Sequence, residues 1–234
     1  MVVLSVSGLE LVRGLGDQSF VVTLPEIRLQ AGEVIAITGP SGSGKSTLIE
    51  GLGLLCSPRA VESFHLQGED ITSAVAAGRG VSDTYLAQLR THQIGFVPQT
   101  GGLLPYLTVE ENIRLQARIL GRAADPTWIM GMLEQLGLLG LGKRYPQDLS
   151  VGQRQRVSFL RAMGHRPAIL LADEPTAALD PDHARLLFDL MLATVQKIGI
   201  AMIVVTHEWD LVTEFDLRPL RAHHRGVGNV EFIA

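Results

Sequence analysis

The sequence is poor in cysteine and has no long apolar run. Cys56 is the only cysteine among 234 residues, so no disulfide can form within the chain, which is typical of a reducing compartment. No apolar run approaches the roughly 18 residues that a membrane-spanning helix needs. The first ten residues lack the basic segment and the long apolar stretch of a secretory signal. We therefore expect a soluble, cytoplasmic chain, for which any membrane role must come through a partner.

The chain also lacks a strong excess of either charge. It carries 20 Lys and Arg against 24 Asp and Glu, a formal net charge of -4, and its pI is about 6.0. Nucleic-acid-binding domains are typically basic, so we expect no nucleic acid as the main partner. The length of 234 residues is sufficient for one or two domains. Since no linker composition separates two domains, we expect a single domain over residues 1–234.

Short apolar runs alternate with helical patterns along the chain. Three of these runs are apolar almost throughout, as in strands that are covered on both faces of a parallel sheet. We predict strands at Val2–Val6, Val34–Thr38, Ile94–Pro98, Ile169–Ala172 and Met202–Thr206. We predict helices at Lys45–Leu55, Val109–Leu120, Val151–Met163 and His183–Lys197. This order favours an α/β fold with a doubly wound, mainly parallel sheet.

Two regions depart from this regular order. The first thirty residues are typical of antiparallel strands, because Phe20, Val22 and Leu24 occupy every second position. The segment at about residues 84–165 is mostly helical and lies between strands of the predicted sheet. We expect the first region to form an N-terminal antiparallel β-subdomain and the second to form an inserted helical subdomain.

A phosphate-binding loop, or P-loop, follows the predicted strand Val34–Thr38 and opens a helix. Residues 39–46 fit the pattern G-x-x-x-x-G-K-[ST] in full. The glycines let successive backbone N–H groups point at phosphate oxygens, and the N-terminus of the helix adds a positive dipole. The predicted nucleotide-binding residues are Gly39, Ser41, Gly42, Ser43, Gly44, Lys45, Ser46 and Thr47. Lys45 is expected to reach the β- and γ-phosphates, and Ser46 to bind Mg²⁺.

Two carboxylates follow the apolar run Ile169–Ala172. Because a sheet interior does not hold bare carboxylates, Asp173 and Glu174 are expected at the C-terminal end of the strand, where ligands bind in such folds. Asp173 is predicted to hold Mg²⁺, directly or through water, and Glu174 to polarise the attacking water as a general base. His207 ends another apolar strand and is either a structural histidine or a contact to the γ-phosphate. A P-loop alone does not distinguish kinases, GTPases, helicases and transport ATPases.

The segment Leu149–Val157 makes that distinction. It reads Leu-Ser-Val-Gly-Gln-Arg-Gln-Arg-Val, and its serine can cap a helix whose free N–H groups form a second anion site. The segment resembles the LSGGQ signature of ABC (ATP-binding cassette) ATPases, which have a P-loop NTPase fold. Six motifs follow the order of that family: the P-loop, Gln99, the signature Leu149–Gln153, the acidic strand Ala168–Glu174, Ala178–Asp180 and His207. The resemblance spans nearly the whole chain and identifies it as a member of this family.

The resemblance implies that the signature binds nucleotide in a pair of chains. ABC ATPases pair head to tail, so that each ATP lies between the P-loop of one copy and the signature of the other. Ser150, Gly152 and Gln153 are therefore expected to contact ATP held by a second copy of this chain, and Asp180 to cross the interface. ATP would favour the closed dimer, and hydrolysis would release it.

The same resemblance implies roles for two further polar residues. Gln99, which follows the predicted strand Ile94–Pro98, is expected to bind Mg²⁺ and take part in hydrolysis. It is also expected to relay the nucleotide state to an integral membrane permease through the helical insert. His207 is expected to act as the γ-phosphate switch.

Two positions depart from the family pattern. Val151 replaces the first glycine of the signature, and because a β-branched residue does not readily adopt φ > 0, ordinary backbone angles and retained activity are expected. The family places a tyrosine that stacks on adenine where this chain has Val12–Gly14. Phe20 is the nearest aromatic residue, and it either stacks on adenine or simply packs beneath the β-subdomain.

Residues 85–92 and 94–112 resemble the lipoprotein-releasing and macrolide-exporter branch of ABC transporters. This implies a peripheral ATPase at the cytoplasmic face of the cell membrane that powers a separate permease subunit. The alternatives are a soluble non-transport ABC ATPase, the cell-division ATPase of the same branch, and a module that binds ATP without hydrolysing it. The intact Glu174 and His207 argue against the last alternative.

Overall fold

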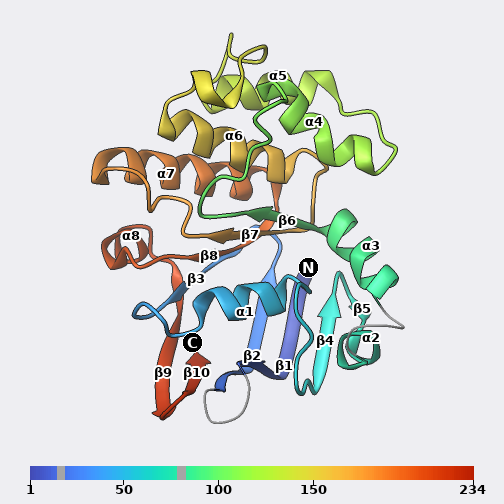
Figure 1. Ribbon diagram of the computed structural model, residues 1–234, viewed down its shortest axis with the longest axis vertical. Coiled ribbons are helices and arrows are strands. Elements are labelled where there is room, and N and C mark those ends of the chain that lie inside the picture. The colour runs from blue at the N-terminus through green and yellow to red at the C-terminus, as the bar shows by residue number, and fades with distance from the viewer. Residues whose placement is uncertain (15–18, 78–82) are drawn as a thin grey trace.

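The computed structural model describes residues 1–14, 19–77 and 83–234 (Figure 1). Its strands are β1 (Val2–Arg13), β2 (Phe20–Gln30), β3 (Val34–Thr38), β4 (Ser63–Leu66), β5 (Glu69–Asp70), β6 (Ile94–Val97), β7 (Ile169–Asp173), β8 (Ala201–Val205), β9 (Arg218–Gly226) and β10 (Asn229–Ile233). Its helices are α1 (Lys45–Leu52), α2 (Thr72–Ala76), α3 (Asp83–Gln93), α4 (Val109–Ile119), α5 (Pro126–Gln135), α6 (Val151–Met163), α7 (Pro181–Ile198) and α8 (Trp209–Glu214), with a short 3-10 helix, η2, at Pro146–Asp148.

The strands form one sheet with a parallel and an antiparallel half. The order across the sheet is β5-β4-β1-β2-β10-β9-β3-β8-β7-β6. Strands β3, β8, β7 and β6 run parallel, whereas β1 is antiparallel to β2 and β4. The hairpin β9–β10 joins the halves, because β10 pairs with β2 and β9 pairs with β3. The predicted α/β fold with an N-terminal antiparallel part is therefore confirmed.

Both faces of the parallel half are covered, which explains why its strands are apolar throughout. On one face, Ile35 and Ile37 of β3 belong to a core that includes Leu48 of α1. On the other face, Ala36 belongs to a second core that includes Val157 of α6 and residues of α7. Figure 1 shows α1 and the group α4 to α7 on opposite sides of the sheet. The helix that follows the P-loop and the helix that follows the signature thus lie on different faces.

The helical part contains α4, α5 and α6 and lies at one end of the molecule (Figure 1). Its helix α4 begins with a capping box, in which Thr108 and Glu111 satisfy each other's backbone N–H groups. The buried Asn112 accepts a hydrogen bond from the N–H of Leu104 and donates to the carbonyls of Leu104, Leu107 and Thr108. One buried amide therefore fixes the loop before α4 relative to the helix.

Several element bounds differ from those predicted. Strand β1 continues to Arg13, well beyond Val6, because it pairs with β2 along its length. Helix α1 ends at Leu52, three residues early, and Leu54 beyond it has φ of 58°. Strand β6 lies inside the predicted helical segment 84–165, so the continuous helical part begins after this strand, at α4. Helix α3 directly precedes β6 and contacts it. No helix in the described ranges combines the length and hydropathy that a membrane span requires.

Candidate functional site

The P-loop connects β3 to α1 at the carboxyl end of β3, and two of its glycines are required by packing. Gly44 has φ of 87°, and a Cβ added there would lie 2.5 Å from Val22 Cγ2 and 2.7 Å from Phe20 Cε1. Gly39 has φ of 155°, and its added Cβ would lie 2.7 Å from Ala222 Cβ. Strands β2 and β9 therefore pack directly against the loop, which leaves room for glycine alone at these two positions. The ring of Phe20 lies against this loop and also packs on the core beneath it.

The interior of the P-loop carries a buried ammonium group. Lys45 is only 6% exposed, and its Nζ donates hydrogen bonds to the carbonyl oxygens of Gly39 at 2.9 Å and Pro40 at 3.0 Å. The Oγ atom of Ser43 is buried without a hydrogen-bond partner. A buried cation, an unpartnered hydroxyl and a helix N-terminus together suit a polyanion such as a triphosphate.

A half-buried carboxylate lies next to the P-loop at the end of β7. Burial raises the pKa of Asp173, whereas a hydrogen bond with Ser46 opposes that change. This contact brings together two of the three residues that the sequence predicts as Mg²⁺ ligands. Their oxygen atoms, with the amide oxygen of Gln99 as the third predicted ligand, are of the kind that Mg²⁺ prefers when phosphate oxygens complete the coordination. The residues present therefore fit the ion.

Three predicted catalytic side chains converge beyond the ends of β6, β7 and β8. Gln99 Nε2 donates a hydrogen bond to Glu174 Oε2 at 3.0 Å. His207 Nδ1 lies 3.7 Å from the same oxygen. Because these strands are parallel neighbours, their carboxyl ends meet at one edge of the sheet, as expected for a ligand site in such folds. Glu174 has φ of 44°, in the left-handed region, and its N–H donates to the carbonyl of Val205.

The signature begins a helix, as predicted. Ser150 Oγ accepts a hydrogen bond from the N–H of Gln153 at 3.2 Å, and Gln153 Oε1 accepts from the N–H of Ser150 at 2.9 Å. Val151 is the first residue of α6 and is not among the described residues with positive φ, so the expectation of ordinary backbone angles is confirmed. A Cβ on Gly152 would lie 3.8 Å from Leu179 Cδ2, which places the signature beside the segment that ends at Asp180.

The chain does not bring its own signature to its own P-loop. Across residues 1–14, 19–77 and 83–234, no hydrogen bond or ion pair joins residues 39–47 to residues 149–153. Asp180 caps α7, and its exposed carboxylate contacts Nδ1 of His183, which lowers the pKa of Asp180. The predicted site residues therefore form two groups: the P-loop with the acidic strand end, and the signature with Asp180.

One polar face of α6 was not predicted as functional. Gln155 Nε2 donates to the carbonyl of Gln99 at 3.0 Å, Ser158 Oγ donates to the carbonyl of Gly101 at 2.6 Å, and the guanidinium of Arg161 donates to the carbonyl of Gly102. We call these three residues of α6 the hydrogen-bond strip. Their spacing of three residues places them on one side of the helix. The spacing of these polar residues was the one sequence signal that could have indicated a shared polar face. The strip connects the helix that follows the signature to the segment that carries Gln99.

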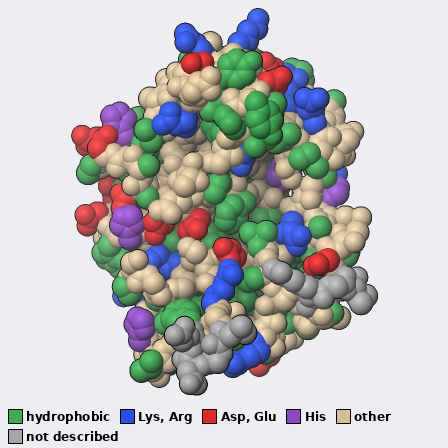
Figure 2. All heavy atoms as spheres, viewed as in Figure 1, with side chains coloured by type: hydrophobic (Ala, Val, Ile, Leu, Met, Phe, Trp, Pro, Cys, Tyr) green, Lys and Arg blue, Asp and Glu red, His purple; other side chains and the backbone are tan. Residues whose placement is uncertain are grey.

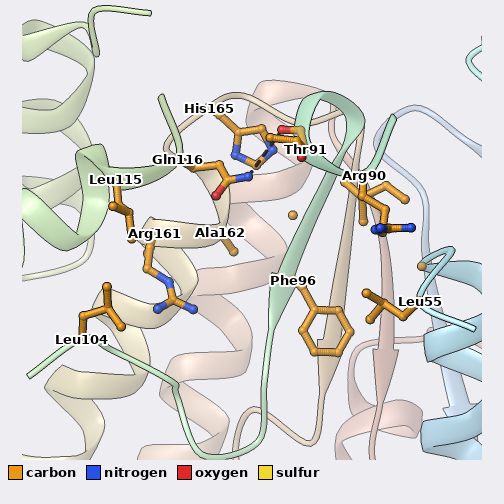
Figure 3. A pocket seen from close by; sticks show the side chains of 13 residues that line it. Leu55, Arg90, Thr91, Phe96, Leu104, Leu115, Gln116, Arg161, Ala162 and His165 are labelled. Atoms are coloured by element: carbon orange, nitrogen blue, oxygen red, sulfur yellow. Dashed lines mark hydrogen bonds between the residues drawn. The ribbon is translucent and has the colours of Figure 1, made fainter. Parts of the chain in front are cut away.

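A groove of about 350 Å³ lies where α4 and α6 meet the sheet (Figure 3). Leu55 and Phe96 line one side of the groove, and Leu104 and Leu115 line the other. Two guanidinium groups, those of Arg90 and Arg161, also line it. The remaining lining residues are Gly53, Thr91, Ile94, Gly95, Gln116, Ala162 and His165. Figure 2 shows hydrophobic side chains at the surface in the middle of the face drawn, with both basic and acidic side chains near them. The groove is therefore apolar and carries positive charge.

Comparisons with known proteins agree with this geometry. A protein-family model described as ABC transporter matches residues 25–177. The lipoprotein-releasing system ATP-binding protein LolD of Nitrobacter hamburgensis is 40% identical over 196 residues, which are 82% of this chain and 81% of the relative. LolD of Idiomarina loihiensis is 40% identical over 203 residues, which are 85% of each protein.

Two solved structures have the same architecture. A bacterial ABC transporter cassette, solved as a dimer, matches with a TM-score of 0.76 and 28% identity over 97% of this chain and 96% of that one. The same cassette in a dimeric post-hydrolysis state, bound to ADP and Pi, matches with a TM-score of 0.75, 28% identity and the same coverage of both chains.

Proposed function

Because the chain belongs to the ABC transporter family and is an ATP-hydrolysing subunit of the lipoprotein-releasing type, we propose that it works as a head-to-tail pair that powers a separate membrane subunit. The observation that carries the ATPase assignment is the convergence of Gln99, Glu174 and His207 beside the P-loop. Binding of ATP alone would not require a carboxylate held between an amide and an imidazole. A water molecule activated there could attack the γ-phosphate.

Each polar group at this edge has a distinct task. Lys45 exchanges its hydrogen bonds to loop carbonyls for bonds to the β- and γ-phosphates. Ser46, Asp173 and Gln99 would hold Mg²⁺, which neutralises phosphate charge when it is bound. Glu174 accepts the proton of the attacking water. His207, whose Nδ1 lies 3.7 Å from that carboxylate, would contact the γ-phosphate as the switch.

Two copies of the chain are needed to complete each nucleotide site. The P-loop helix α1 packs on one face of the parallel sheet and the signature helix α6 packs on the other, so one chain cannot enclose its own γ-phosphate. Ser150 and Gly152 at the N-terminus of α6 form a second anion site that suits the phosphates held by the other copy. Asp180 lies beside this signature and would cross the interface. Phe20, against Gly44, is our proposed adenine contact.

The groove in Figure 3 is the proposed docking site for the membrane subunit. Its leucines and Phe96 suit the apolar side of a short helix, and its two guanidinium groups suit an acidic side chain on that helix. Arg161 both lines the groove and belongs to the hydrogen-bond strip, which ends at Gln99. A docked segment would therefore lie within two helical turns of the residue that senses the nucleotide. The chain would then act peripherally at the cytoplasmic face of the cell membrane.

Replacement of Glu174 by glutamine tests the assignment of the base. Glutamine keeps the size and the hydrogen-bond acceptor but cannot take a proton, so we expect turnover to fall by about 10²- to 10⁴-fold while ATP binding is retained. The ATP-bound pair should then accumulate, which size-exclusion chromatography would detect. Glu134→Gln, on the exposed face of α5, is the matched control and should leave turnover unchanged. Normal turnover in Glu174→Gln would show that another group activates the water.

An affinity pull-down from detergent-solubilised membranes tests the partner. We expect a membrane protein to copurify with the wild-type chain. Reversal of the groove charge in Arg90→Glu should weaken this copurification more than Arg185→Glu, an exposed change on α7. Recovery of the chain without a membrane protein, under conditions that preserve a known ABC complex, would favour a soluble ABC ATPase.

A further inference from the structure

Two loops meet beyond the ends of β7 and β8 through a short hydrogen bond. Thr176 is only 2% exposed, and its Oγ1 donates to Glu208 Oε1 at 2.5 Å. The N–H of Glu208 donates in turn to Oγ1 of the buried Thr206 at 3.0 Å. Glu208 is thus bonded through its side chain to the loop after β7 and through its backbone to the end of β8.

This link lies next to two of the three converging side chains. Thr176 follows Glu174 by two residues, and Glu208 follows His207 directly. The turn after Glu174 is closed by a hydrogen bond from the N–H of Ala177 to the carbonyl of Glu174. Any movement of Thr176 is therefore transmitted through one tight turn to the backbone of Glu174.

His207 depends on its backbone for its position. Its side chain is 59% exposed, and its one polar contact in the described chain is the 3.7 Å approach to Glu174. An exposed imidazole without a hydrogen bond is not held in place by packing. The bonds of Glu208 fix the backbone immediately after His207, and so they fix where the ring can reach.

We propose that Thr176 and Glu208 form a positioning pair that sets the separation between the base Glu174 and the switch His207. Neither member touches the nucleotide in this assignment; the pair acts on hydrolysis by keeping the two loops in register. Because Glu174 holds a left-handed conformation that is unfavourable for a glutamate, the turn needs an external contact to maintain it. The buried Thr176 hydroxyl, bonded to Glu208, provides that contact. This inference rests on the proposed roles of Glu174 and His207.

Four single variants and one double variant test the pair by ATPase kinetics. Thr176→Val removes the hydroxyl at nearly constant shape, and Glu208→Ala removes its acceptor. Each variant should lower kcat by about ten- to a hundred-fold with little change in KM, because a misplaced group affects the chemical step. Thr176→Ser keeps the donor hydroxyl and Glu208→Gln keeps an acceptor oxygen, so each should retain most of the wild-type turnover. The double variant Thr176→Val/Glu208→Ala should be no slower than the slower single variant, because both changes break one bond.

Unfolding and nucleotide binding are measured in parallel. Urea unfolding at the assay temperature establishes that each variant is folded in the absence of denaturant. Binding of a fluorescent ATP analogue is expected to be unchanged. Full turnover in a folded Glu208→Ala, or additive losses in the double variant, would overturn the pair. Loss of turnover in Glu208→Gln but not in Thr176→Val would also overturn it, since Glu208 would then act through its charge. If Glu174→Gln retained turnover, the proposed base would fail, and this outcome is independent of the other variants.

Discussion

Ser158 makes the middle bond of the hydrogen-bond strip, and replacing it with alanine tests what the strip does. The side chain is fully buried, and its Oγ lies 2.6 Å from the carbonyl oxygen of the buried Gly101. Alanine fits the same space without a donor. The carbonyl of Gly101 is then left in the interior without its hydrogen bond, two residues from Gln99.

The size of the effect follows from this burial. A buried carbonyl that loses its partner destabilises the fold by about 1–3 kcal/mol. For a chain of this length, each kcal/mol lowers the melting temperature by about 2–4 °C. We therefore expect Ser158→Ala to melt about 6 °C below the wild type. Gln155 and Arg161 still hold the same segment on either side, so turnover at 25 °C should fall by less than the Glu174→Gln variant loses.

Thermal unfolding followed by circular dichroism, with ATPase turnover measured on the same samples, provides the assay. Ser57→Ala is the control, because Ser57 is exposed and makes no hydrogen bond among the described residues; its stability should change by no more than about 0.5 kcal/mol. If Ser158→Ala matched this control in both melting temperature and turnover, the strip would contribute nothing to holding Gln99, and the proposed route from groove to nucleotide would be wrong.

Two further predictions concern protonation. Burial raises the pKa of Asp173, so its ionised form destabilises the folded chain as the pH rises above the ordinary value of 3.8. Asp173→Asn removes this charge and should therefore raise the melting temperature of the nucleotide-free chain at pH 7. Turnover should fall in the same variant. A lower melting temperature in that variant would contradict the burial argument. Burial lowers the pKa of His165 from 6.5 to about 4, so stability is lost as the pH falls through this window. The loss at pH 5 should be on the order of 2 kcal/mol, and urea unfolding at pH 7 and pH 5 should show a smaller loss in His165→Gln than in the wild type. Equal losses would mean that other groups titrate there.

The parts of the site that one segment encodes could be predicted from the sequence. The P-loop, the acidic end of β7 and the cap at Ser150 each depend on neighbours within about ten residues, so their residue types and spacing carry the information. The apolar strands Val34–Thr38 and Ile169–Ala172 were also predictable, because only a strand covered on both faces is apolar throughout. The ordinary backbone of Val151 followed from its β-branched side chain.

Contacts between distant segments could not be predicted. Gln155 and the carbonyl of Gln99 are 56 residues apart, and Thr176 and Glu208 are 32 residues apart. Each of these polar residues is compatible with an exposed position when only its own segment is considered. Burial and partner are set by how helices and loops pack on the sheet, which the spacing of residues in one segment does not specify. Strand β6 itself was predicted at Ile94–Pro98, but the start of the continuous helical part at α4, after this strand, was not.

The order of strands in the sheet has a consequence for how the chain folds during synthesis. Gln30 of β2 and Val34 of β3 are four residues apart in sequence, yet β10 and β9 lie between their strands in the sheet. Synthesis proceeds from the N-terminus, so the edges of β2 and β3 that face the hairpin stay unpaired until residues 218–233 leave the ribosome. The hairpin β9–β10 therefore completes the sheet, because it pairs with both halves. A nascent chain arrested before Arg218 should expose both edges to chaperones, and the fold should close only when the hairpin arrives.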